Sequence, residues 1–179
     1  MDKRVQIHDL AFREIITPED IHAKVQALGQ QITEDYQGQK PHFVAVLNGA
    51  FIFAADLVRA VKLESSIGFV KLSSYDGLQS TGQIKTELNL PEENVKGQHI
   101  IIVEDIVDTG RTLSAFKRDL QKWNPASVKI ASLLLKPEAL QHDLSVDYLG
   151  FSIPPDFVIG YGLDYNEGGR QLAGIYQKI

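Results

Sequence analysis

A run of four β-branched aliphatic residues, Ile100 to Val103, constrains the fold of this chain more than any other feature. Such a continuous apolar run is typical of a central strand that is covered on both faces of a parallel sheet. An acidic and hydroxyl-rich stretch, 104–112, follows directly, and beyond Thr112 the apolar residues recur with helical spacing. We therefore expect this stretch to be a loop at the carboxyl end of the strand and at the entry to a helix.

The same order of strand, loop and helix is found elsewhere in the chain. Strand character is present in 43–47, 67–72 and 128–135, and helix character in 51–61. Thr17 and Pro18 are favourable residues for the start of a further helix. This alternation predicts an α/β fold with a parallel sheet, helices on both faces and ligands beyond the carboxyl ends of the strands. A length of 179 residues is appropriate for one domain, residues 1–179.

Composition limits the classes of function. The net charge of -5 argues against broad affinity for nucleic acid, so we expect no nucleic-acid partner. The absence of cysteine excludes disulfides, thiolate nucleophiles and cysteine-type zinc sites. The charged first ten residues do not have the apolar core of a signal peptide, and no window is long enough to span a membrane. These properties predict a cytoplasmic protein without a membrane partner.

The loop after the central strand has the chemistry of a phosphate site. A helix N-terminus favours a phosphate, and residues 109–112 add hydroxyl groups and a glycine that allows close approach. Glu104, Asp105 and Asp108 would repel that phosphate, so they are expected to serve a vicinal diol or a hydrated Mg²⁺ of the same ligand. An acidic helix-capping turn or a calcium loop is the alternative. A calcium loop is disfavoured because a strand precedes the loop and Val107 occupies one of its alternate positions.

The segment from Val103 to Thr112 resembles the phosphoribosyl pyrophosphate signature of type I phosphoribosyltransferases, in the form found in hypoxanthine-guanine phosphoribosyltransferases. The resemblance implies that Glu104 and Asp105 hold the ribose hydroxyls and a metal ion, and that Asp108 is the catalytic base near purine N7. The implied residues for the ribose 5′-phosphate are Thr109, Gly110, Arg111 and Thr112, and Asp108 belongs to the same phosphoribosyl pyrophosphate site. The family fold is a central, mostly parallel sheet flanked by helices, with a small hood formed by terminal segments and a flexible active-site loop.

Two further segments match the family in the same order. Asn48 and Gly49 align with the pyrophosphate loop, although the family often has lysine or arginine where this chain has Asn48; the alternative is an ordinary turn. Ser74 and Tyr75 resemble the flexible loop that closes over the active site, and place a lid at about 73–86. On composition alone, an exposed hairpin is an equal alternative for this polar stretch.

The C-terminal run 153–172 is the second close match. The resemblance implies that Phe157 stacks on the purine and that Val158 offers its backbone to the edge of the base. It further implies that Asp164 binds Mg²⁺ through water and that Arg170 contacts pyrophosphate. The base-binding hood segment is expected at about 137–179.

Lys136 is the residue from which we predict which purine the protein binds. It ends a predicted strand before Pro137, so its side chain is expected at the cleft edge of the sheet. An ammonium group only donates hydrogen bonds, so it can bind the carbonyl of a 6-oxopurine but not the amino group of adenine. The corresponding lysine of the family has this contact. A solvated lysine at a strand end is the alternative.

The resemblance implies a purine salvage phosphoribosyltransferase that acts on hypoxanthine, guanine or both, with phosphoribosyl pyrophosphate and Mg²⁺. The partners are then small-molecule substrates, and the family commonly forms homodimers and homotetramers. A xanthine-preferring enzyme is one alternative. The other is a regulator of the same fold that binds nucleic acid, for which the acidic composition is unfavourable.

Overall fold

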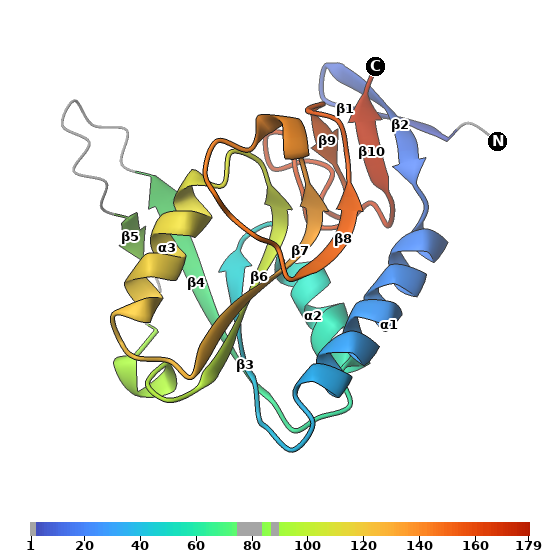
Figure 1. Cartoon of the computed structure of the whole chain (residues 1–179). Helices are drawn as coiled ribbons and strands as arrows, with labels where there is room; N and C mark the ends of the chain where they lie inside the picture. Colours follow the sequence, from blue (N-terminus) through green and yellow to red (C-terminus); the bar gives the residue numbers. More distant parts are fainter. Residues whose placement is uncertain (1–2, 75–83, 87–89) are drawn as a thin grey trace.

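The computed structural model describes residues 3–74, 84–86 and 90–179, and its centre is a mostly parallel sheet (Figure 1). In spatial order its strands are β5 (Ile84–Thr86), β4 (Ser66–Ser74), β3 (His42–Leu47), β6 (His99–Val107), β7 (Ser127–Leu135) and β8 (Tyr148–Ser152). Neighbouring strands are parallel except β4 and β5, which are antiparallel. The predicted α/β class and mostly parallel sheet are confirmed.

The central strand β6 is buried on both faces, as its apolar run predicts. Ile101 and Val103 belong to the core beneath the helices α1 (Pro18–Asp35) and α2 (Phe51–Ala60). Ile100 and Ile102 belong to the core beneath α3 (Arg111–Gln121), on the opposite face. Successive residues alternate between the two cores because side chains of a strand point to opposite faces.

The helices begin where local sequence favours a start. The hydroxyl of Thr17 accepts a hydrogen bond from the Asp20 amide at 3.1 Å, and Pro18 is the first residue of α1. Helix α3 begins at Arg111, directly after the loop that follows β6. Short 3₁₀ turns are present at Glu92–Asn94 and Pro137–Ala139.

A second, antiparallel sheet joins the two ends of the chain. Its strands, in spatial order, are β1 (Arg4–Ile7), β2 (Leu10–Ile16), β10 (Ile175–Lys178) and β9 (Val158–Ile159). Phe12, Ile159 and Tyr176 form its small core. This sheet agrees with the hood of terminal segments that the family resemblance implies (Figure 1). Because β8 pairs with β7 in the large sheet, the C-terminal segment contributes only β9 and β10 to the hood sheet.

The structure differs from the sequence-based expectation at the end of the central strand. Strand β6 continues to Val107, because its parallel pairing with β7 persists as far as Leu135. Glu104 and Asp105 are therefore residues of the strand and not of the loop. In the predicted lid, Ser74 is the last residue of β4, and Tyr75 lies outside the described residues. None of the helices in the described part of the chain is long and apolar enough to cross a membrane.

Candidate active site

The loop between β6 and α3 forms a small pocket of about 150 Å³. Its lining is Glu104, Ile106 and residues 107–113. Gly110 precedes α3 with a φ of 75°, a backbone conformation that favours glycine over residues with a side chain. No side chain caps this helix, and the first-turn amides together with the threonine hydroxyls suit the oxygens of a phosphate.

Glu104 and Asp105 are adjacent at the carboxyl end of β6, and their two side chains interact with each other. Glu104 lines the pocket beside α3, whereas Asp105 packs against Gly49 of the loop before α2. Burial raises the pKa of Glu104 well above its ordinary value, and the neighbouring Asp105 carboxylate raises it further. When ionised, the two carboxyl groups offer only hydrogen-bond acceptors. A diol would supply the matching donors, and a hydrated cation would supply both donors and positive charge.

The Asn48-Gly49 loop meets the C-terminal segment at close range. The peptide bond between Leu47 and Asn48 is cis. An added Cβ on Gly49 would overlap the Asp105 carboxylate, and one on Gly162 would overlap the carbonyl oxygen of Gly49. Glycine at both positions therefore brings the ends of β3 and β6 and the segment after β9 together.

Asp108 and Lys136 form an ion pair at the ends of the adjacent strands β6 and β7. The Lys136 ammonium lies 3.3 Å from Asp108 Oδ2, and the two side chains are 11% and 55% exposed, respectively. The Lys136 amide also donates to the Val107 carbonyl at 2.9 Å. The pair presents a hydrogen-bond acceptor beside a donor at the mouth of the pocket.

Phe157 directly precedes the hood strand β9 and Val158 is its first residue, and the two differ in exposure. Phe157 is 45% exposed, and its ring contacts those of Phe12 and Tyr165 at centroid distances of 6.3 and 5.9 Å. Val158 is buried. A half-exposed ring with these contacts can stack on a flat ligand.

Asp164 and Arg170 are bound to each other and to the backbone near Gly162. Arg170 Nη2 lies 2.8 Å from Asp164 Oδ1, and Arg170 Nη1 donates to the Gly162 carbonyl at 2.8 Å. Among the described residues there is no group of three or more histidine or acidic side chains that could hold a metal. The metal-binding roles named from sequence for Glu104, Asp105 and Asp164 stay predictions.

This geometry agrees with the comparisons with known proteins. A family profile described as the phosphoribosyl transferase domain matches residues 14–166. The chain belongs to the phosphoribosyltransferase family. It is 41% identical over 168 residues to the hypoxanthine phosphoribosyltransferase of Buchnera aphidicola, covering 92% of this chain and 94% of that protein. It is 40% identical over 167 residues to the hypoxanthine-guanine phosphoribosyltransferase of Mycobacterium tuberculosis, covering 90% and 83%.

The solved structures that resemble this chain belong to the same family. The hypoxanthine-guanine phosphoribosyltransferase of Bacillus anthracis is similar with a TM-score of 0.86 and 37% identity, covering 93% of this chain and 96% of that one. The hypoxanthine phosphoribosyltransferase of Trypanosoma cruzi is similar with a TM-score of 0.88 and 34% identity, covering 98% and 95%.

In this phosphoribosyltransferase, six of the residues named from sequence lie in three contact pairs. These are Asp108 with Lys136, Asp105 with Gly49, and Asp164 with Arg170. Sequence reasoning missed Tyr161 and Asp56, whose side chains form a hydrogen bond beside the last group. The glycines on both sides of Tyr161 were a signal for an unusual backbone, whereas nothing in the local sequence distinguishes Asp56 from other surface acids on a helix.

Proposed function

We propose that this chain is a purine salvage phosphoribosyltransferase that converts hypoxanthine, guanine or both, with 5-phosphoribosyl 1-pyrophosphate, into IMP or GMP and pyrophosphate. The contact between Asp108 and Lys136 is the observation that carries the proposal. A carboxylate beside an ammonium complements N7–H and O6, which are neighbours on one edge of a 6-oxopurine. Relatives with 40–42% identity that are named hypoxanthine or hypoxanthine-guanine phosphoribosyltransferase support it.

In the proposed binding mode, each part of the substrates contacts one of the groups of residues described above. The loop 109–112 holds the 5′-phosphate with amides and hydroxyls, and Glu104 with Asp105 accepts hydrogen bonds from the ribose diol. Phe157 stacks on the base, and Lys136 donates to O6. An adenine amino group would place a donor against this ammonium, so adenine is excluded.

The side chains of Glu104 and Asp105 also fit Mg²⁺, because both offer carboxylate oxygens at one end of β6 and a nearby cation would offset the repulsion that raises the pKa of Glu104. Together they would hold the ion through water, with Asp164 as a separate water-mediated contact. When bound, the ion supplies charge that neutralises pyrophosphate and the ribose oxygens.

In the proposed reaction, purine N9 attacks the anomeric carbon as the bond from that carbon to pyrophosphate breaks. Asp108 takes the N7 proton, so the base does not accumulate positive charge as the new bond forms. Arg170 and the backbone amides near Gly49 hold the leaving pyrophosphate. Stabilising the leaving group is the main requirement, since the anomeric carbon passes through an oxocarbenium-like state.

A spectrophotometric assay with phosphoribosyl pyrophosphate, Mg²⁺ and one base at a time tests the proposal. Hypoxanthine or guanine should be converted, and adenine should not. Turnover of xanthine in preference to both would support a xanthine-preferring enzyme instead. The absence of turnover with every base would refute the enzymatic proposal.

The proposal includes a homodimer or homotetramer in the cytoplasm. In the Trypanosoma cruzi relative, the C-terminal region has a role in oligomeric state and enzymatic activity. The cysteine-free sequence agrees with a reducing compartment. Light scattering coupled to size-exclusion chromatography measures the assembly, and a monomeric mass would contradict this part.

A further inference from the structure

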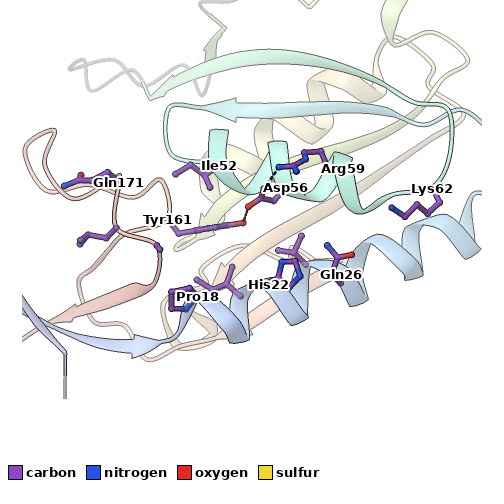
Figure 2. Close-up of a pocket in the computed structure, with 13 residues that line it drawn as sticks. Pro18, His22, Gln26, Ile52, Asp56, Arg59, Lys62, Tyr161 and Gln171 are labelled. Atoms are coloured by element: carbon purple, nitrogen blue, oxygen red, sulfur yellow. Dashed lines mark hydrogen bonds and ion pairs between the residues drawn. The ribbon is translucent and has the colours of Figure 1, made fainter. Parts of the chain in front are cut away.

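A cavity of about 590 Å³ lies between α1, α2 and the segment that follows β9 (Figure 2). Within it, the Tyr161 hydroxyl donates a hydrogen bond of 2.6 Å to Asp56 Oδ2. Arg59 Nη1 lies 3.6 Å from the other carboxylate oxygen. Tyr161 is buried, and burial together with this hydrogen bond raises the pKa of its hydroxyl, so the group stays a donor at physiological pH.

Tyr161 is held in an unusual backbone conformation. Its φ of 49° is uncommon for a residue with a side chain, and it lies between glycines with φ of 102° and 107°. Its amide donates to the Leu172 carbonyl at 2.7 Å. The surrounding contacts retain this strained turn, and the hydrogen bond to Asp56 ties it to α2.

The two partners of this hydrogen bond belong to the two halves of the proposed pyrophosphate site. Asp56 is on α2, which begins at Phe51, directly after the Asn48-Gly49 loop. Tyr161 precedes Gly162, which packs on the Gly49 carbonyl and accepts the hydrogen bond from the Arg170 side chain. The Gly162 amide also donates to the Arg170 carbonyl at 3.0 Å.

We infer that Tyr161 and Asp56 are positioning residues, whose hydrogen bond sets the placement of Arg170 relative to the Gly49 loop before pyrophosphate binds. This inference rests on the proposed function and deepens it. A short hydrogen bond to a carboxylate is among the stronger polar contacts in proteins. Arg170 and the loop amides must converge on one ligand, so holding them in advance lowers the entropic cost of binding it.

The test is the variant Tyr161→Phe, which removes only the hydroxyl. The KM for phosphoribosyl pyrophosphate should rise by about tenfold. The KM for hypoxanthine, measured with the other substrate saturating, should change by less than about twofold, because no base contact is altered. Asp56→Ala should match Tyr161→Phe, whereas Asp56→Asn should stay near the wild type, because its amide oxygen still accepts the hydrogen bond.

Tyr148→Phe is the matched control. The Tyr148 hydroxyl donates to Asp35 Oδ2 at 2.7 Å, so this is the same kind of bond on a buried tyrosine. It lies at the start of β8, at the amino-end edge of the parallel sheet, away from the proposed site. Both tyrosine variants should lower the melting temperature by about 2–4 °C. Only Tyr161→Phe should change the KM for phosphoribosyl pyrophosphate.

A readout that does not depend on turnover accompanies the kinetics. Phosphoribosyl pyrophosphate with Mg²⁺ should raise the melting temperature of Tyr161→Phe less than that of the wild type at the same concentration. An unchanged KM in Tyr161→Phe, or an equal rise in Tyr148→Phe, would overturn the inference. If Tyr161→Phe does not fold, equal KM values for Asp56→Ala and Asp56→Asn would overturn it. A wild type inactive with every base would instead refute the proposed function.

Discussion

Gly49→Ala is a sharp test of how the proposed site is packed. An added Cβ at this position would lie 2.5 Å from Asp105 Cγ and closer still to Oδ2. Ordinary contact between such atoms is about 3.5–4.0 Å, so the carboxylate must move by about 1 Å. That movement is opposed because Asp105 Oδ1 accepts a hydrogen bond of 2.8 Å from the Ile106 amide.

The expected cost follows from this overlap. Forcing a methyl group into a packed position typically costs about 1–3 kcal/mol, so we expect Gly49→Ala to lose about 2 kcal/mol of the free energy of unfolding. For a chain of this length that corresponds to a fall in melting temperature of about 4–8 °C. The KM for phosphoribosyl pyrophosphate should rise by about tenfold, because the displaced Asp105 no longer faces the ribose. Thermal unfolding by circular dichroism and steady-state kinetics measure the two effects.

A double-mutant cycle supplies the control. Asp105→Ala removes the atoms that the new methyl group would strike, so Gly49→Ala should cost less than about 0.5 kcal/mol in that background. The coupling between the two positions should therefore be about 1.5 kcal/mol. Equal costs of Gly49→Ala in the two backgrounds would refute the steric reasoning, whatever the kinetics show.

Three further predictions concern the carboxylates and the lysine. Asp108→Asn should lower kcat by about 10²–10⁴-fold, with little change in melting temperature because this side chain is 55% exposed; unchanged turnover would remove Asp108 from the chemistry. Lys136→Met should raise the KM for hypoxanthine by about 10–100-fold and Lys136→Gln by less, because only glutamine keeps a donor; equal KM values would contradict the role at O6. The raised pKa of Glu104 means that its ionisation disfavours the folded state, a cost that increases as pH rises above the ordinary value of 4.5. Glu104→Gln should therefore melt above the wild type by a margin that widens as the pH rises above 4.5, and a margin independent of pH would contradict the shift.

The pairing of Asp108 and Lys136 shows how far sequence reasoning reaches into the site. Both residues were named from sequence, one after each of two predicted strands. Their contact depends on β6 and β7 being neighbours in register, with Val107 opposite Leu135. Local sequence predicts a strand but not its neighbour, so the ion pair was not foreseen.

Glu104 and Asp105 show a different limit. The polarity of 104–112 was interpreted as a loop, yet β6 extends to Val107 because pairing with β7 continues. The strand places Glu104 beside the loop before α3 and Asp105 beside Gly49, while the two carboxyl groups still interact with each other. The pairing of β6 with β7, and not the polarity of the segment, therefore decided that these two residues belong to the strand.

By itself, the sequence determined the buried central strand, the helix starts at Thr17 and near Arg111, and the glycine-containing turn before α3, because apolar runs, caps and turn residues act over a few neighbouring positions. Only the tertiary structure decided the hood sheet, in which Gln177 pairs with Arg13, and the hydrogen bond from Tyr161 to Asp56. These contacts join residues far apart in the chain, and they form only when the two cores and the short segments between them have packed.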